Sequence, residues 1–521
     1  MKKITSILLA MMLILGLCST AMLTVGAEGA TSDTWDGTAS VKWYIDGPNA
    51  DDEYELKSAE DLAGLAYLVG AANTEGRYIG VYYRADGTVE GYVPGTKDVS
   101  HQDSSLIPTS VEGLTSVNGD TFLGKTVVLT VDVVLNEGNA ADWATTAPAN
   151  MWQPIGGNIP DGAKRAAFDG LFDGQGHTVS GLYYKSTICF GGLFGATGQQ
   201  FPVTIQNLKL TNFYVSGVDS IGALVGRSNK GLTVSNVQVS NGIVEGTESG
   251  AGAVIGTVFG GPVTFQNCAV ESAKVQGALY LGIFTGMTVS QDLTVTDSYV
   301  KNSSVKGTGQ CAVVCGRMAG GNITVRNLYA IVELEATGTE AEKNSQLAGA
   351  GLVYAVAGDN NKPGAKAIEN LFHISTVTGA VINEEMADQA TAVELTQITG
   401  DAAKTTLTGF DFETVWKAVE GDTPVIELRG GTEGGNEDED DDFLPEDGGN
   451  EDEDTGSTNN GGTTNNGNTN NETNAPETNA PETNAPTANE EKSGCGSVVG
   501  FTGFMLVALI SGAAVMLKKE N

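Results

Sequence analysis

Basic residues and histidine are scarce in this sequence. It holds 28 Lys and Arg against 64 Asp and Glu, which gives a formal net charge of −36. A protein that neutralises nucleic-acid phosphates needs a basic face, so this balance argues against a nucleic-acid partner. The three histidines, His101, His177 and His373, lie far apart along the chain. The sequence therefore predicts neither a histidine-rich metal site nor a cofactor, and histidine-based catalysis is not expected.

Proline, charged residues and aromatic residues are also few, whereas glycine is abundant. The 521 residues include 14 Pro and 70 Gly, with 18% charged and 7% aromatic residues. The glycines lack the every-third-residue period of collagen, so they indicate many turns rather than a fibre. A chain of this length forms either several domains or one long repeat array.

The first 27 residues have the composition of a secretory signal peptide. Lys2 and Lys3 precede an apolar run over residues 4–17, and Val25-Gly26-Ala27 follows as a small-residue cleavage site. We expect residues 1–27 to be removed, with Ala27 at the cleavage site. Leu17 stands before Cys18, where lipoprotein signals resemble one another in having a small residue, so lipidation of Cys18 is not favoured.

The last 28 residues indicate a membrane anchor. Residues 498–517 form an uncharged apolar stretch of 20 residues, and Lys518 and Lys519 follow it. A helix of this length spans ~30 Å, one bilayer core, and the lysines favour a cytoplasmic end. The alternative is a buried core helix. The small residues around Cys495, the apolar stretch and the basic end, together residues 494–521, resemble bacterial surface-sorting signals, although the Leu-Pro-x-Thr-Gly signal is absent. Whether Cys495 is processed or lipidated stays open.

An acidic segment precedes this anchor. Residues 432–491 contain 18 Asp and Glu and no Lys or Arg, together with Asn, Thr and Pro repeats. Such a composition does not bury a core, so residues 431–493 are expected to form a disordered linker that acts as a stalk. A solvated, self-repelling stalk is favoured over a site for calcium or for a basic partner.

The middle of the chain repeats itself about every 30 residues. Three columns keep this spacing: closing glycines, corner asparagines or aspartate, and valines. They are Gly195, Gly226, Gly256, Gly286 and Gly316; Asn207, Asn236, Asn267, Asp297 and Asn327; and Val215, Val244, Val275 and Val305. Alternating β-branched residues lie between them, which predicts an all-β, right-handed β-helix or β-solenoid of stacked rungs. We expect the glycines to form corners and the asparagines to stack as a hydrogen-bonded ladder.

A sixth rung is visible in stretched form near residues 351–353 and 370–372. The insertion before it, residues 337–346, is expected to form a loop.

Two motifs upstream of the repeats carry a family resemblance. They are Trp152-Gln153-Pro154-Ile155-Gly156 and the run from Phe168-Asp169-Gly170 to Gly174-Gln175-Gly176-His177. With the rungs that follow, residues 54–428 resemble the GLUG-motif repeat proteins of bacterial surfaces. The resemblance implies a β-helix-like region on secreted or anchored proteins, often adhesin-like, with no catalytic residues to carry over. It favours a capping region over residues 28–120 and the solenoid over residues 121–430.

Few residues point to catalysis. Asp169, Asp173 and His177 suggest an acid/base cluster on one short loop, but Asp-Gly and Gly-x-Gly pairs more often mark tight turns. Polysaccharide lyases and glycoside hydrolases on β-helices gather carboxylates on an exposed sheet, whereas residues 203–335 hold eight acids without a repeated column. Cys311 and Cys315 align with apolar positions and are expected in the core.

One column suggests a binding site. Two residues after the corner positions stand Lys209 and Gln238, which mark an outward face. Ala269 follows, and then three aromatic residues in successive rungs, Tyr299, Tyr329 and Phe372. Exposed rings stacked in register suit sugar rings or a partner protein. The alternative is cross-rung stabilisation, or cover by the loop of residues 337–346.

The sequence as a whole predicts a non-catalytic protein displayed at the cell surface. Its expected partners are a glycan or an extracellular protein ligand, and the membrane through the C-terminal helix. A structural spacer or surface-layer component is the first alternative. A glycan-cleaving enzyme is the less favoured one.

Overall fold

The computed structural model describes residues 34–72, 78–94, 106–157, 166–339, 348–355, 364–378 and 390–427. The predicted signal peptide with Ala27, the acidic linker, and the anchor with Cys495 lie outside these residues. Within the described ranges, no helix is long and apolar enough to cross a membrane.

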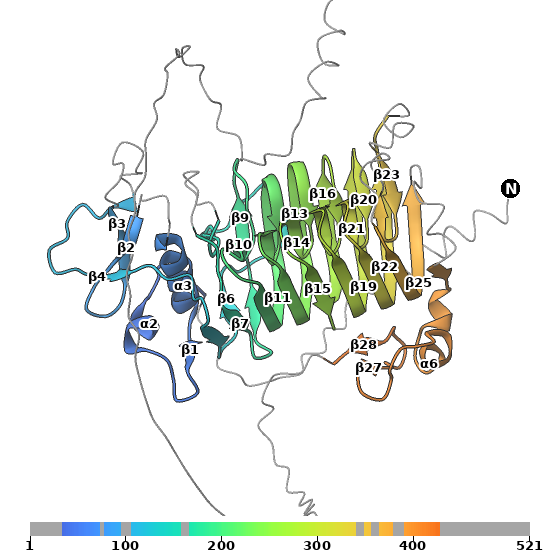
Figure 1. Ribbon diagram of the computed structural model, residues 1–521, viewed down its shortest axis with the longest axis horizontal. Helices are drawn as coiled ribbons and strands as arrows, with labels where there is room; N and C mark the ends of the chain where they lie inside the picture. Colours follow the sequence, from blue (N-terminus) through green and yellow to red (C-terminus); the bar gives the residue numbers. More distant parts are fainter. Residues whose placement is uncertain are drawn as a thin grey trace, which may run out of the picture. The chain divides into compact units, whose positions relative to one another are not determined.

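The described chain is mostly β, and its centre is a parallel β-solenoid of about six turns (Figure 1). The first strands of each turn, on both sides of its first corner, belong to one large sheet. Its solenoid strands are β7 (Leu171–Asp173), β8 (Thr178–Ser180), β9 (Tyr183–Lys185), β11 (Val203–Gly222), β13 (Leu232–Gly252), β15 (Val263–Gln266), β16 (Ala269–Gly277), β17 (Leu281–Gly282), β19 (Leu293–Gly307), β20 (Gln310–Ala312), β22 (Ile323–Ala336), β23 (Gly349–Gly351) and β25 (Lys366–Thr378).

A second sheet of six strands closes each turn. It contains β10 (Phe194–Thr197), β12 (Val225–Ser228), β14 (Ile255–Val258), β18 (Thr285–Val289), β21 (Cys315–Ala319) and β24 (Tyr354–Ala355). The predicted period is confirmed, because Val215, Val244, Val275 and Val305 are register partners in successive turns. The stretched sixth rung is confirmed as well, since Leu328 of β22 pairs with Leu371 of β25.

The predicted asparagine ladder is present at the first corner of successive turns, with a break at Asn267, whose Oδ1 has no hydrogen-bond partner among the described residues. Asn236 Nδ2 donates to Asn207 Oδ1 at 2.7 Å, and Asn370 Nδ2 donates to Asn327 Oδ1 at 2.9 Å. These residues also make the corner, because Asn236 has φ 57° and Asn207 has φ 53°. Asparagine is one of the few L-residues that tolerates this left-handed region.

The closing glycines have a different role from the predicted one. They are not among the residues with positive φ, so the expectation that they form the corners is wrong. They permit close approach of the backbone instead: a Cβ on Gly256 would lie 2.3 Å from Ile221 N, and one on Gly316 would lie 2.4 Å from Leu281 N. Any side chain there would push neighbouring segments apart.

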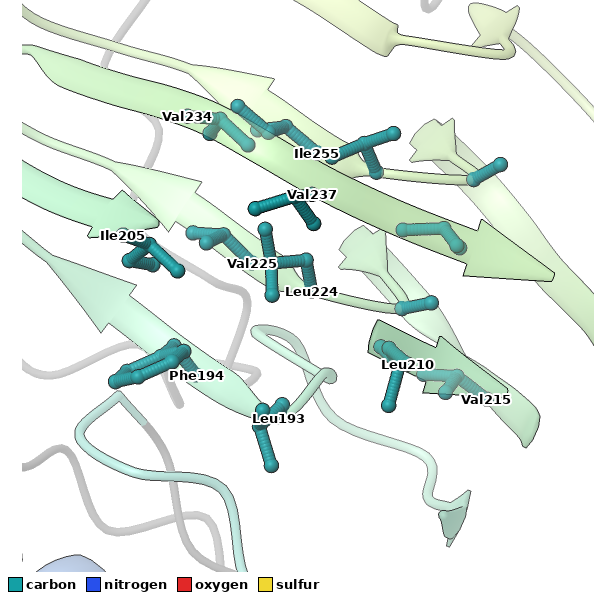
Figure 2. Packing of buried hydrophobic residues seen from close by; sticks show 14 of the residues in the cluster. Leu193, Phe194, Ile205, Leu210, Val215, Leu224, Val225, Val234, Val237 and Ile255 are labelled. Atoms are coloured by element: carbon teal, nitrogen blue, oxygen red, sulfur yellow. The ribbon is translucent and has the colours of Figure 1, made fainter. Parts of the chain in front are cut away.

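The interior between the two sheets is filled with aliphatic side chains. Figure 2 shows Ile205 and Val234 of the large sheet in the same interior as Val225 and Ile255 of the second sheet, and all four are fully buried. The predicted core positions of Cys311 and Cys315 are confirmed, since both are free and buried.

The N-terminal region continues directly into this stack. It comprises α2 (Lys42–Asp46), β1 (Glu53–Leu56), α3 (Ala59–Ala71), β2 (Tyr78–Tyr83), β3 (Val89–Pro94), β4 (Thr115–Asn118), β5 (Thr126–Leu129), β6 (Val133–Val134) and the 3₁₀ turn η3 (Ala140–Asp142). Strand β1 pairs in parallel with β5. The Ser58 side chain caps α3 by accepting from Asp61 N at 3.2 Å, and Leu62 and Leu65 of α3 are fully buried in the core shared with the solenoid. The fold is therefore mostly, and not exclusively, β.

A C-terminal segment, residues 390–427, follows the last turn. It contains β26 (Ala390–Ala392), the 3₁₀ turn η4 (Leu395–Gln397), α6 (Ala402–Thr406), β27 (Trp416–Lys417) and β28 (Val425–Ile426). Strand β26 pairs with β25, which attaches the segment to the solenoid.

Candidate functional site

The predicted aromatic column is in register. Ala269, Tyr299, Tyr329 and Phe372 are partners in successive turns. The rings of Tyr299 and Tyr329 stack with centroids 5.2 Å apart and an interplanar angle of 4°. The predicted stacking is therefore confirmed for Tyr299 and Tyr329, whereas Phe372 shares their register and makes its ring contact with Phe410.

The predicted exposure of this column is wrong. Tyr299, Tyr329 and Phe372 are only 2%, 0% and 6% exposed, because the C-terminal segment covers them. Trp416 lies 6.0 Å from the ring of Tyr299 and 5.8 Å from that of Tyr329, and Phe410 lies 5.8 Å from Phe372. Most of the loop that we expected as an alternative cover, residues 337–346, lies outside the described residues.

Polar contacts hold the same cover in place. The Tyr329 hydroxyl donates to the Pro424 carbonyl at 2.6 Å, and Lys301 Nζ lies 2.7 Å from the Asp422 carboxylate. Burial raises the pKa of Tyr329, so its hydroxyl keeps its proton and remains a donor. These contacts make the column an internal joint between the solenoid and residues 390–427, and not a free surface.

A second outward column is covered in a similar way. The rings of Tyr183 and Tyr214 stack with centroids 5.9 Å apart, and Trp143 packs edge-on against Tyr183 at 6.1 Å. Ala140 N donates to Asn212 Oδ1 at 2.9 Å, which fixes the covering turn η3 to the corner of β11.

The outer side of the first strand in each turn is exposed. Two columns of side chains point outward there, and we call them the threonine face: Thr204, Thr233, Thr264, Thr294 and Thr324, followed two residues later by Gln206, Ser235, Gln266, Thr296 and Arg326. The register is continuous over five turns. All ten side chains are at least partly exposed, whereas the residues between the two columns, such as Ile205 and Val234, are buried.

The threonine face is neutral in a strongly acidic protein. Nine of its ten side chains are hydroxyls or amides without charge. The exception, Arg326, pairs with Glu369 of the next turn at 3.2 Å. The face therefore offers hydrogen-bond donors and acceptors at a regular spacing, ~4.8 Å from turn to turn.

The sequence analysis missed this face although its signal was present. The five threonines keep the same spacing of about 30 residues as the corner asparagines. Threonine is common in β-strands, so the column was not distinguished from ordinary strand composition.

A depression of about 600 Å³ adjoins the N-terminal end of the threonine face. It is lined by Leu123, Gly124, Lys125, Thr126, Asp169, Gly170, Leu171, Phe201, Pro202 and Thr204. Two of these residues are unusually exposed for their type: Phe201 at 55% and Leu123 at 41%. Exposed apolar side chains around one hollow are typical of a ligand-binding surface.

Asp169 is the acidic residue of this depression. It is only 4% exposed. Its Oδ1 accepts from Gln200 N at 3.0 Å, whereas its buried Oδ2 has no hydrogen-bond partner among the described residues. This oxygen has essentially no accessible surface, so Asp169 is an internal group of the fold and does not present an acceptor to a ligand in the depression.

The suspected acid/base cluster is not assembled. Asp173 accepts from Gln175 N at 2.8 Å and from Asn207 Nδ2 at 3.0 Å, so it starts the asparagine ladder. His177 Nδ1 lies 3.2 Å from Asp132 Oδ1. Asp169, Asp173 and His177 thus have separate partners, and the turn interpretation of this motif is supported. Within the described part of the chain, no group of three or more His, Cys, Asp or Glu is arranged to hold a metal ion.

Comparison with known proteins gives one partial similarity. Over 230 residues, 43% of this chain, the sequence is 29% identical to the protein named Halomucin from Haloquadratum walsbyi. The matched part is 2% of Halomucin, so the chain spans a very small share of that protein's length. No family model matches the chain, and no solved structure matches it significantly.

Proposed function

We propose that this protein is a secreted, non-catalytic β-solenoid, displayed at the cell surface, that binds a neutral glycan through the threonine face. The proposal rests on two columns of at least partly exposed side chains, mostly hydroxyls and amides, that stay in register over five turns. Five turns span ~19 Å between the first and last threonine. A glycan chain offers hydroxyls along a comparable length, and these pair with Thr, Ser and Gln side chains as both donors and acceptors.

Surface display belongs to the same proposal. It is supported by the signal-peptide and anchor patterns at the two ends of the sequence and by the GLUG-type resemblance. The β-solenoid fold and the partial similarity to Halomucin are compatible with a surface protein. The anchor would attach the chain to the membrane, and the acidic linker would extend it outward.

The composition of the threonine face favours binding over cleavage. Glycan-cleaving enzymes act through a pair of carboxylates that flank the bond to be broken. None of the ten side chains of the threonine face is a carboxylate. An extracellular protein ligand remains the second candidate for this face, because a flat, partly exposed sheet with hydrogen-bonding groups also suits a protein surface.

The test is a glycan-array screen of the intact protein, followed by a triple variant of the three central threonines, Thr233→Val, Thr264→Val and Thr294→Val. Valine keeps the β-branched shape and removes the hydroxyl, so the solenoid should stay folded while glycan binding is lost. The matched control is the triple Thr→Ser variant, which keeps the hydroxyls and should retain binding.

Binding that is equal in the Val and Ser variants would contradict the role of the threonine face. A screen in which no glycan binds would favour the protein ligand or the structural spacer instead.

A further inference from the structure

The outer side of the second sheet carries an arginine between two aromatic rings. Arg227 of β12 is half-buried, whereas Val225 and Ser228 of the same strand are fully buried in the interior, so Arg227 projects outward. Its guanidinium carbon lies 3.9 Å from the centre of the Phe259 ring and 5.2 Å from that of Phe190. Phe190 precedes β10 and Phe259 follows β14, so rings from the preceding and the following turn flank the cation.

The Arg227 guanidinium has no carboxylate partner in the described part of the chain. Two other arginines differ in this respect: Arg84 Nη2 lies 2.5 Å from Glu90 Oε1, and Arg326 Nε lies 3.2 Å from Glu369 Oε2. In Arg227, Nε is enclosed without a hydrogen-bond partner among the described residues, whereas the two terminal nitrogens are not enclosed. The end of the guanidinium is therefore left to donate to a ligand from solvent.

The neighbouring carboxylate does not neutralise this cation by direct contact. Asp219 accepts from Ser220 Oγ at 3.0 Å. Burial lowers the pKa of Arg227, and the charge of Asp219 opposes that change. A half-buried guanidinium without a contacting anion has lost hydration without gaining an ion pair. A carboxylate from outside the chain supplies what is missing, because its two oxygens match the paired N–H groups of a guanidinium.

We infer that Arg227 is the carboxylate-binding residue of a site for one hexuronic acid residue. The two terminal nitrogens of Arg227 donate to the sugar carboxylate. Phe190 and Phe259 are both partly exposed, and their rings offer apolar contact to the C–H groups of the same sugar. The site lies on a different sheet from the threonine face and takes a charged sugar, so it goes beyond the proposed function and does not depend on it.

The charge around Arg227 favours one carboxylate among neutral hydroxyls over a dense polyanion. The six strands of the second sheet contain two arginines and no Asp or Glu. The register partners of Arg227 are the uncharged Ala196 and Thr257. The whole chain, however, has a net charge of −36, and Asp219 acts on the same site. A nucleic acid or an acidic peptide is repelled by this charge more strongly than a sugar with a single carboxylate.

The experiment compares methyl hexuronides with the matching methyl hexosides, which differ from them only at carbon 6, by titration of the intact protein with ligand-observed NMR. The parent should bind a hexuronide at least about tenfold more tightly than its hexoside. Arg227→Gln removes the cation, and Arg227→Lys keeps the charge without the paired donors. Each should weaken hexuronide binding about tenfold or more. The matched control is Arg84→Gln, which removes the same charge from an ion pair elsewhere and should leave the affinity unchanged.

Chemical modification of the parent protein decides the question if the Arg227 variants are unstable. Phenylglyoxal reacts with accessible guanidinium groups, and the modified peptides are identified by mass spectrometry. Arg227 should react in the free protein, and the hexuronide should protect it whereas the hexoside should not.

Several outcomes would overturn the site. These are hexuronide binding that survives both Arg227 variants, a parent protein without preference for the hexuronide, and an Arg227 that the hexuronide does not protect. Tighter binding of a sugar sulfate, a sugar phosphate or a glutamate-rich peptide at Arg227 would also overturn it, because the ligand class would then be wrong. The proposed function is tested separately, since the Thr→Val triple variant of the threonine face should bind the hexuronide as the parent does.

Discussion

Burying a charge in the stacked core tests the register of the solenoid. Val244 of β13 is fully buried, and its partners above and below are Val215 and Val275. Val244→Asp replaces a side chain of similar size. Loss of the apolar burial costs roughly 1.5–3 kcal/mol, and an unpartnered carboxyl in the core costs about 1–3 kcal/mol more even when uncharged.

The sum, roughly 2.5–6 kcal/mol, is a large part of the stability of a typical domain. Because each turn is held by its neighbours, we expect the turns around β13 to unfold first. The melting temperature should fall by at least about 5 °C, measured by circular dichroism.

The matched control is Thr233→Asp on the same strand. Thr233 faces outward and is partly exposed, so its new charge stays in water and should change stability by less than about 0.5 kcal/mol. A Val244→Asp protein that melts like the parent, or a Thr233→Asp protein that is the more damaged of the two, would refute the assigned faces.

Three further predictions concern the corners, the C-terminal segment and the thiols. Asn236→Ala should lower the free energy of unfolding by about 1–2 kcal/mol, because alanine disfavours the left-handed corner. Asn236→Gly should lower it by less in the same urea titrations. Equal losses of stability in the two variants would mean that the corner conformation does not matter. Trp416→Ala should lower the free energy of unfolding by about 3–5 kcal/mol, because a large buried ring is lost. A variant as stable as the parent would show that residues 390–427 do not depend on this contact. In the native protein, iodoacetamide should not label the buried thiols of Cys268, Cys311 and Cys315 until urea is added, because burial raises the pKa of each thiol to about 12. Rapid labelling of the native protein, seen by mass spectrometry, would contradict their burial.

The repeating part of the fold was predictable because one physical pattern recurs. Each turn needs the same inward valines and the same left-handed corner, so Val244 and Asn236 reappear at a fixed spacing and identify the solenoid. The role of the glycines was not predictable in the same way. Glycine is required at position 256 because a Cβ there would lie 2.3 Å from the backbone nitrogen of Ile221 in another segment. That close approach depends on the three-dimensional path of the chain.

The candidate site was predicted only in part. The sequence indicated that Tyr299 and Tyr329 face outward from the solenoid and stack, but it gave no sign that residues 390–427 return to cover them. That cover depends on non-local contacts such as those from Trp416 to the tyrosine rings. The unpartnered oxygen of Asp169 likewise follows from burial in the folded chain, and no spacing in the sequence indicates it.

Hydroxyl-radical footprinting of the intact protein, with and without a polysaccharide identified in the glycan screen, tests the central claim most directly. The account predicts that Phe201 and the peptides of the threonine face are labelled in the free protein and protected by the polysaccharide. Tyr299, Tyr329 and Trp416 should remain unlabelled in both states, because they are buried against one another. Strong labelling of these three rings in the free protein, with protection there and none on the threonine face, would contradict the account.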